Sequence, residues 1–278
     1  MTLRTLAASA VIALSASLLP ACSTTSSTQP GVVGVDREQR FFVSSEQINQ
    51  AAAQAYAQVM ADAQKKGALN RNQAQVQRVR AITQRLIPAA SAFRQDALKW
   101  QWEANVISSN EVNAWAMPGG KIAVYTGIIE KLNLTDDELA AIMGHEIGHA
   151  LREHGRERAS QQMAQSTVLG IGAAILGIGE IGQALSQAVL DVTFNLPHSR
   201  QDEVEADRIG VELAARAGFD PRAAVALWQK MAQLGGNGGP SFLSTHPEPG
   251  ARMADLQAYA QKVMPLYSAA KASPSAGK

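Results

Sequence analysis

The sequence has little of several residue types, and each shortage excludes a class of protein. Its single cysteine, Cys22, cannot form an intramolecular disulfide. Aromatic residues make up only 5% of the chain, which leaves few side chains on which bases could stack. The 25 Lys and Arg nearly balance the 24 Asp and Glu, so no net positive field attracts nucleic acid. We therefore expect no nucleic-acid partner.

The longest apolar runs are too short to cross a bilayer. The run from Leu6 to Leu19 follows Arg4 and is typical of an export signal over residues 1–21. It ends in Leu19-Pro20-Ala21-Cys22, which resembles the lipobox of bacterial lipoproteins. We expect Cys22 to carry a lipid anchor that attaches the protein to a membrane. An ordinary signal peptide with an idle cysteine is the alternative. In such signals Ser23 after the cysteine implies the outer membrane, facing the periplasm.

The remaining chain divides by composition. We expect residues 22–40 to comprise the lipidated cysteine and a flexible tether, because they are rich in Ser, Thr, Gln, Pro and Gly up to Gly34. With 46% hydrophobic residues in the whole chain, residues 41–267 can form one folded domain. Helical spacing predicts two helices, Ser45–Ala63 and Asn72–Ile87, the second closed by Pro88. These belong to residues 41–100, which we expect to be integrated with the domain. Residues 268–278 are predicted to be a disordered tail.

A β-hairpin is predicted between Trp100 and Tyr125. Apolar residues alternate there with polar ones, and a Pro118-Gly119-Gly120 turn joins two short runs. An exposed strand edge can hold an extended peptide through its main chain. The candidate edge residues are Asn113, Ala114, Trp115 and Ala116. A purely structural hairpin is an equal alternative.

A metal-binding pattern lies inside the next predicted helix. Thr135-Asp136-Asp137-Glu138 is a capping box that begins the helix, which should run to about Arg156. Residues four apart lie within about 40° of one another around a helix, so His145 and His149 can share one ion. Glu146 lies beside that ion, where it can accept a proton from the attacking water. This pattern predicts a catalytic site with one Zn²⁺ per chain.

A catalytic zinc needs a third protein ligand. Arg152 and Gly155 stand where a metzincin has Gly and His, which excludes that class. His154 lies about 140° from His149 around the expected helix, so we expect it to face solvent.

A later acidic segment offers the better third ligand. Glu203 and Asp207 share one face of a predicted amphipathic helix that continues to Gly218. We assign Glu203 as the third ligand and Asp207 as the carboxylate that orients a ligand histidine. Glu205 points about 200° away from Glu203 and is expected to be solvated. The alternative is a solvated acidic helix start favoured by the helix dipole.

These motifs resemble a known family of zinc metallopeptidases, which includes HtpX and the CAAX prenyl proteases, specifically its soluble bacterial branch with LoiP and BepA. The resemblance implies an α+β, mainly α gluzincin domain with a small β-sheet beside the active-site helix. In that family the motif around His246 borders the cleft, which implies transition-state binding or gating of the open zinc position. It also suggests Arg252 as an anchor of that loop, although a structural role is as well supported. The resemblance spans Asn113 to Arg252, and its carriers are Asn113-Ala114, Pro118-Gly119-Gly120, the His145–His149 motif, Ser199-Arg200, Glu203 to Asp207, Gly210, Thr245-His246-Pro247 and Arg252.

The resemblance also implies a function, namely proteolysis of unfolded or misassembled envelope proteins in quality control. The partners would be unfolded protein or peptide substrates, with the outer-membrane assembly machinery as a further candidate. Too few residues follow the last helical segment for a tetratricopeptide repeat such as BepA has. The apolar stretch Thr167 to Gly179 is expected to pack as a helical hairpin over the active site or to touch the membrane. The rival functions are a chaperone with secondary proteolysis and a hydrolase of peptidoglycan peptides.

Overall fold

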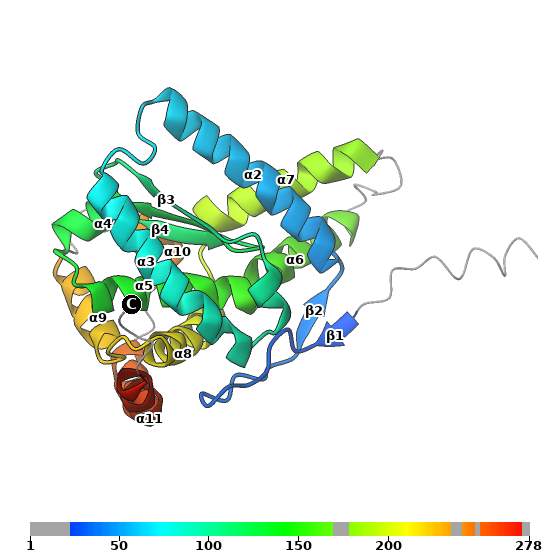
Figure 1. Ribbon diagram of the computed structural model, residues 1–278. Helices are drawn as coiled ribbons and strands as arrows, with labels where there is room; N and C mark the ends of the chain where they lie inside the picture. Colours follow the sequence, from blue (N-terminus) through cyan, green and yellow to red (C-terminus); the bar gives the residue numbers. More distant parts are fainter. Residues whose placement is uncertain (1–22, 169–177, 235–240, 248–250, 274–278) are drawn as a thin grey trace, which may run out of the picture.

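The computed structural model describes residues 23–168, 178–234, 241–247 and 251–273. Helices dominate this part of the chain, and a small three-stranded sheet lies among them (Figure 1), which confirms the expected mainly helical α+β class. The elements are β1 (Ser23–Thr25), β2 (Gln39–Phe41), α2 (Ser45–Lys65), α3 (Gln73–Ala89), the short 3₁₀ turns η2 (Ala90–Ala92) and η3 (Asp96–Lys99), β3 (Glu103–Ile107), β4 (Ala114–Met117), β5 (Lys121–Tyr125), α4 (Thr126–Lys131), α5 (Asp136–Leu151), α6 (His154–Val168), α7 (Ile178–Phe194), α8 (Arg200–Arg216), α9 (Ala223–Gln233), α10 (Ser241–Thr245) and α11 (Arg252–Ala272).

The three-stranded sheet has the order β3-β5-β4. β4 and β5 are antiparallel and joined by the turn at Pro118-Gly119-Gly120, as the hairpin prediction requires, and β3 runs parallel to β5. Gly119 and Gly120 have φ angles of 78° and 83°, a region that glycine adopts without steric cost. β4 lies at the edge of the sheet and contacts α5 through the N–H of Ala116.

Helices cover both faces of this sheet. Successive residues of a strand point to opposite faces. Trp115 and Met117 pack in one apolar cluster with residues of α2 and α7, whereas Ala114, Ile122 and Val124 pack in a larger cluster with residues of α3 and α5. In Figure 1, α2 and α7 cross on one side of the sheet and α5 runs along the other. The sheet therefore holds α5 from one side.

Helix α8 supports α5 from the opposite side, through the most extensive contact between two elements in the described residues. Glycines make this contact possible. A Cβ on Gly144 would lie 2.8 Å from the carbonyl oxygen of Gly210, and a Cβ on Gly148 would lie 2.8 Å from that of Ala206. Side chains larger than hydrogen would separate the helices. This packing brings side chains of α8 to the buried face of α5.

The helix expected to run from Thr135 to Arg156 is two helices. Thr135 caps α5 as predicted, but α5 ends before Glu153 and α6 begins at His154. The chain turns at Glu153, whose φ is 53°, an unusual value for a residue with a side chain. The Glu153 carboxylate forms ion pairs with Arg156 at 2.9 Å and Arg94 at 3.4 Å. These contacts stabilise a turn that no local pattern indicates.

Residues 23–40 pack on the domain, so the expectation of a flexible tether is wrong for this segment. β1 pairs with β2, and the side chains of Val33 and Val35 are buried. The N–H of Val33 donates to Glu212 Oε2 at 3.0 Å, and Arg37 forms ion pairs with acidic residues that include Glu205. A few contacts with distant residues therefore order a polar segment whose composition predicts disorder. Cys22 lies outside the described residues.

Two helix ends also differ from expectation. Pro88 lies inside the last turn of α3, which ends one residue later. Helix α11 continues to Ala272, so the first residues of the expected disordered tail are helical. Leu266 and Tyr267 pack against the core just before them, which anchors the helix at that point. Most of the stretch from Thr167 to Gly179 lies outside the described residues.

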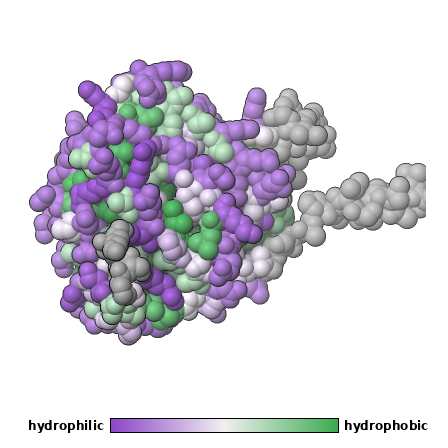
Figure 2. Space-filling view, in the orientation of Figure 1, coloured by the Kyte–Doolittle hydropathy of each residue, from purple (hydrophilic) through white to green (hydrophobic). Residues whose placement is uncertain are grey.

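The surface is mainly hydrophilic, with small separate apolar patches on the face shown in Figure 2. Among the described residues, the exposed large apolar side chains are Val32, Phe42, Leu98 and Leu234. No helix in the described ranges is long and apolar enough to cross a membrane.

Candidate metal centre

Two histidines of α5 lie next to each other on its buried face. His145 and His149 are each 4% exposed, and their Nε2 atoms are 3.1 Å apart. Four residues separate them, which returns the second ring to the face of the first. Glu146 follows His145 directly and is also buried. The helix thus places both imidazoles and one carboxylate in the same small volume.

Glu203 reaches the two rings from α8. Its side chain is completely buried, with Oε1 3.3 Å from His149 Nε2 and Oε2 3.6 Å from His145 Nε2. Burial alone would raise the pKa of Glu203, but its interactions with His246 and His149 hold that pKa well below its usual value. The structure therefore brings the three residues predicted as ligands together, with the carboxylate ionised.

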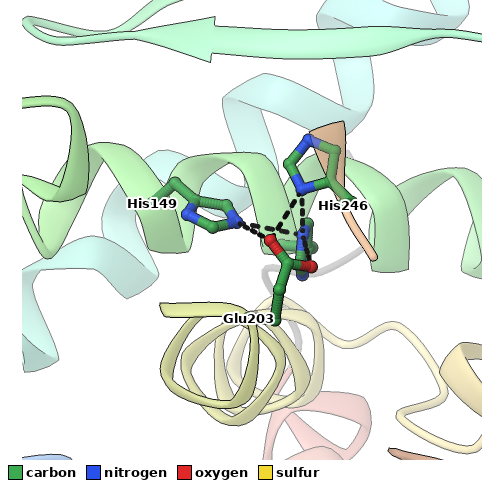
Figure 3. A group of neighbouring side chains, drawn as sticks. His149, Glu203 and His246 are labelled. Carbon is green, nitrogen blue, oxygen red and sulfur yellow. Dashed lines mark hydrogen bonds and ion pairs between the residues drawn. The ribbon is translucent and has the colours of Figure 1, made fainter. Parts of the chain in front are cut away.

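His246, immediately after α10, contributes a fourth potential metal ligand. Its Nδ1 lies 3.0 Å from Glu203 Oε1 and 3.2 Å from His145 Nε2, and its ring stacks on Phe242. Figure 3 shows His149, Glu203 and His246 converging on one point from α5, α8 and the chain after α10. The donor atoms of these residues and His145 all lie within 4.8 Å of one another.

The donor set and its spacing fit Zn²⁺. Nδ1 of His145 lies 2.9 Å from a carboxylate oxygen of Asp207, so Nδ1 carries the proton and Nε2 presents a lone pair. Lone pairs of imidazole and carboxylate then face one another, an arrangement that a cation stabilises. Tetrahedral zinc with bonds of about 2.0–2.1 Å separates its ligand atoms by about 3.3 Å. Five of the contacts among His145, His149, Glu203 and His246 measure 3.0 to 3.6 Å, close to that value.

Asp207 and Arg252 surround this group. Asp207 accepts a hydrogen bond from His145 Nδ1, as expected for a carboxylate that orients a ligand histidine. Arg252 is 1% exposed and donates to Asp207 Oδ1 at 2.7 Å and to Glu203 Oε2 at 3.1 Å. Its guanidinium also lies 3.4 Å from the centre of the Trp228 ring. These contacts of Arg252 hold two carboxylates of α8, which agrees with the structural role given as the alternative to a loop anchor.

The Glu146 carboxylate lies between the metal centre and the sheet edge. Its Oε2 accepts a hydrogen bond from the Ala116 N–H at 3.3 Å, and Oε1 lies 3.4 Å from His246 Nε2. Oε1 has no hydrogen-bond partner among the described residues. Burial raises the pKa of Glu146, and the nearby His246 and His145 only partly oppose that shift. Glu146 is therefore a carboxylate with a raised proton affinity and a free oxygen.

The outer edge of β4 faces this carboxylate. The N–H of Tyr125 donates to the carbonyl oxygen of Asn113, so odd-numbered residues of β4 bond to β5. The main-chain groups of Ala114 and Ala116 consequently point outward. The Trp115 side chain instead packs edge-on against Tyr56 and Phe194. Beside this edge is a cleft that reaches Glu146, His149 and His246 and has both polar and apolar walls; its other lining residues include Trp115, Pro118, Ala150, Val189, Val192 and His198.

Two residues expected to face solvent are buried. His154 is 0% exposed, and its Nδ1 lies 2.9 Å from Nδ1 of His149. Glu205 is 5% exposed and lies 3.2 Å from His154 Nε2. The expectation for His154 failed because the turn at Glu153 redirects its side chain. The expectation for Glu205 failed because three cationic or imidazole side chains cover the second face of α8.

His198 is a site residue that sequence reasoning missed. Its ring lies 4.1 Å from the His149 ring and stacks on His246 at 5.1 Å. The backbone N–H of His198 donates to the carbonyl oxygen of Thr245, which connects the start of α8 to the chain before His246. Burial lowers the pKa of His198 well below its usual value. No regular spacing connects His198 with the α5 motif, so only its position before the Ser199 helix cap could have drawn notice.

Comparison with known proteins settles the family. The profile of Peptidase family M48 matches residues 73–260, which include every donor of the cluster. The chain belongs to peptidase family M48. This M48 domain is a zinc metallopeptidase domain, and the cluster of His145, His149, Glu203 and His246 is the place where it could hold the ion.

Several M48 relatives are similar over part of their length. The mitochondrial metalloendopeptidase OMA1 of Schizosaccharomyces pombe is 38% identical over 159 residues, which cover 56% of this chain and 46% of that protein. OMA1 of Arabidopsis thaliana is 37% identical over 167 residues, covering 57% of this chain and 31% of the plant protein. The beta-barrel assembly-enhancing protease of Escherichia coli is 28% identical over 201 residues, covering 68% and 40%. The chain thus spans less than half the length of these relatives.

Proposed function

We propose that this chain is a zinc-dependent endopeptidase that cleaves unfolded or misassembled envelope proteins. The observation that carries the proposal is the convergence of His145, His149 and Glu203 beside the partly unpaired carboxylate of Glu146. M48 membership and the names of the OMA1 relatives support peptide-bond cleavage. The name of the Escherichia coli relative supports a role in the envelope.

Bound zinc would supply Lewis-acid polarisation of the scissile carbonyl and lower the pKa of a water. The protein supplies the remaining steps. An extended substrate would pair with the outward main-chain groups of Ala114 and Ala116, without selecting particular side chains. Glu146 would accept a proton from the attacking water and return it to the leaving amine. Its raised pKa and free Oε1 suit both transfers.

The position of His246 suggests how access to the ion is controlled. A catalytic zinc keeps one position open for water. Nδ1 of His246 lies at the fourth corner of the donor group, and its Nε2 lies beside Glu146. Cleavage therefore requires His246 to move away from this corner. These contacts therefore favour a role for His246 in gating the open zinc position over a direct role in transition-state binding.

The location and partners are proposed from the sequence. The apolar run before Cys22 and the lipobox-like residues support a lipoprotein of the outer membrane that faces the periplasm. The name of the Escherichia coli relative supports the outer-membrane assembly machinery as a partner. Labelling with a radioactive fatty acid in wild type and Cys22→Ser would test the anchor, and equal labelling would contradict it.

The variant Glu146→Gln tests the proposed reaction. Removing the base should lower casein cleavage by about 10²–10⁴-fold, because general acid–base catalysis contributes that much. The variant should retain one zinc per chain, since Glu146 is not among the proposed ligands. Glu130→Gln changes an exposed glutamate and is the matched control. Unchanged cleavage by Glu146→Gln, or chelator-insensitive cleavage by the wild type, would refute the proposal.

The same variant separates the protease from a chaperone. A chaperone with secondary proteolysis would suppress aggregation of denatured envelope proteins equally well with Glu146 or Gln at this position. A protease of quality control should release peptides that are absent with Glu146→Gln. Mass spectrometry of peptides from a denatured envelope extract makes the distinction.

A further inference from the structure

His154 contacts a proposed zinc ligand on the side away from the donor cluster. Its ring centre lies 4.9 Å from that of His149, and the two Nδ1 atoms are 2.9 Å apart. The left-handed turn at Glu153 makes this contact possible, because it stops α5 and brings the first residue of α6 back over the helix end. His154 is completely buried, so no water competes for its nitrogen atoms.

The protons along this contact can be placed. His149 presents Nε2 to Glu203 and His145, so a lone pair on Nε2 requires the proton to be on Nδ1. Two nitrogen atoms at 2.9 Å share one proton, so His149 donates and His154 Nδ1 accepts. The proton of His154 then lies on Nε2, which is 3.2 Å from Glu205 Oε2. The two hydrogen bonds therefore point in the same direction: His149 donates to His154, and His154 donates to Glu205.

Glu205 is a fixed end for this chain of hydrogen bonds. Arg152 donates to its Oε2 at 2.8 Å and Arg37 to its Oε1 at 2.6 Å. With the N–H of His154 on Oε2 at 3.2 Å, two guanidinium groups and one imidazole surround this carboxylate. The carboxylate is therefore ionised and oriented by three partners.

The other proposed histidine ligand has a shorter version of the same support. His145 Nδ1 donates directly to Asp207, which Arg252 holds at 2.7 Å. Both supporting carboxylates belong to α8, two residues apart. On the His149 side, the path to the carboxylate of Glu205 runs through His154.

We propose that His154 is a positioning residue, which acts through His149 by fixing its tautomer and ring orientation and thereby strengthens zinc binding. This inference rests on the proposed zinc site. A partner of this kind raises the basicity of the ligand nitrogen, and its loss typically weakens metal affinity 10–100-fold. Glu205 completes the support by holding the proton of His154 on Nε2.

Two variants of His154 test the proposal. His154→Phe fills the space but cannot accept the proton of His149, so the zinc dissociation constant should rise about 10–100-fold. In His154→Asn the side-chain oxygen can take the place of Nδ1, and affinity should return to within a few-fold of wild type. The measurement is competition with a chromophoric chelator, together with the visible spectrum of the cobalt-substituted protein. The spectrum should shift in His154→Phe and recover in His154→Asn.

A purely structural role would give a different pattern. Both variants would then lose thermal stability as metal-free proteins without a specific change in zinc affinity or in the cobalt spectrum, which would overturn the inference. If His154→Phe does not fold, Glu205→Gln replaces it, with an expected weakening of zinc binding of several-fold; wild-type affinity in that variant would also overturn the inference. Wild-type protein without stoichiometric zinc would instead refute the proposed function itself.

Discussion

At the scale of single residues, the carboxylates around the metal centre divide by their partners. Glu203, Asp207 and Glu205 each accept a hydrogen bond from a buried arginine, which fixes the orientation of these carboxylates. Glu146 has only the Ala116 N–H as a hydrogen-bond donor among the described residues, and burial raises its pKa. Glu146 is therefore the carboxylate suited to proton transfer, whereas the other three position the residues of the site.

The pH dependence of stability should reveal the ionised state of Glu205. Its folded pKa of about 2 lies below its usual value of 4.5, so the unfolded chain binds the proton first as pH falls. The stabilisation is complete above about pH 4.5 and should be lost as pH falls toward about 2. Urea unfolding of metal-free protein should show the gap between wild type and Glu205→Gln closing across this range. A constant gap would contradict the assigned pKa shift.

Residue spacing could predict part of this site. The four-residue spacing of His145 and His149 and the shared face of Glu203 and Asp207 follow from helix geometry alone. The burial of His154 and the proximity of His198 depend on where the chain reverses after α5. Glu153 at that reversal pairs with the distant Arg94 as well as with the nearby Arg156. An ideal helix continued past Glu153 therefore placed the His154 side chain on the wrong side.

At the scale of elements, the contact between α5 and α8 sets the geometry of the metal centre. Its glycines allow the backbones to touch, and the ligands of the two helices meet beside that contact. A Cβ on Gly210 would lie 2.7 Å from the backbone nitrogen of His145. Any separation of the helices therefore moves Glu203 relative to the two histidines.

Gly210→Ala should separate the two helices. We expect a loss of about 1–3 kcal/mol in unfolding free energy from overpacking and at least a tenfold weaker zinc affinity. Gly182→Ala in α7 is the matched control, because a Cβ there would meet nothing within 4 Å, and it should be neutral or stabilising by up to about 1 kcal/mol. Calorimetry and chelator competition give the two quantities. Equal zinc affinity in both variants would show that the contact does not set the site.

A capping box, a turn and helical spacing predicted several of the elements, and tertiary contacts set ends that these local patterns did not. The start of α5 and the β4–β5 hairpin follow from Thr135, Glu138 and the Pro-Gly-Gly turn. The end of α5 and the extension of α11 could not be predicted, since ion pairs and apolar packing with distant residues stabilise them. Local sequence does not contain those partners.

At the scale of the whole molecule, the segment before α2 connects to the support of the metal centre. Arg37 forms ion pairs with Glu157, Asp202 and Glu205, and so joins the N-terminal segment to α6 and α8. Composition predicted a tether here because it counts polar residues but not their partners. The ordered segment instead forms part of the domain.

Arg37→Ala should destabilise the molecule as a whole. The change leaves three acidic side chains without this guanidinium, and we expect a loss of about 2 kcal/mol because Arg37 is partly exposed. Arg40→Ala removes an exposed arginine of the same segment and should change stability by less than about 0.5 kcal/mol. Thermal unfolding and limited proteolysis before α2 measure the effect. Equal melting temperatures would contradict the packing of this segment.

The proposed chemistry depends on a single zinc ion held by α5 and α8 together. Anomalous diffraction at the zinc absorption edge, from crystals of the full chain purified without added metal, would locate that ion. We expect one peak per chain, bonded to His145, His149 and Glu203. An absent peak, or a peak remote from Glu203, would contradict the assignment.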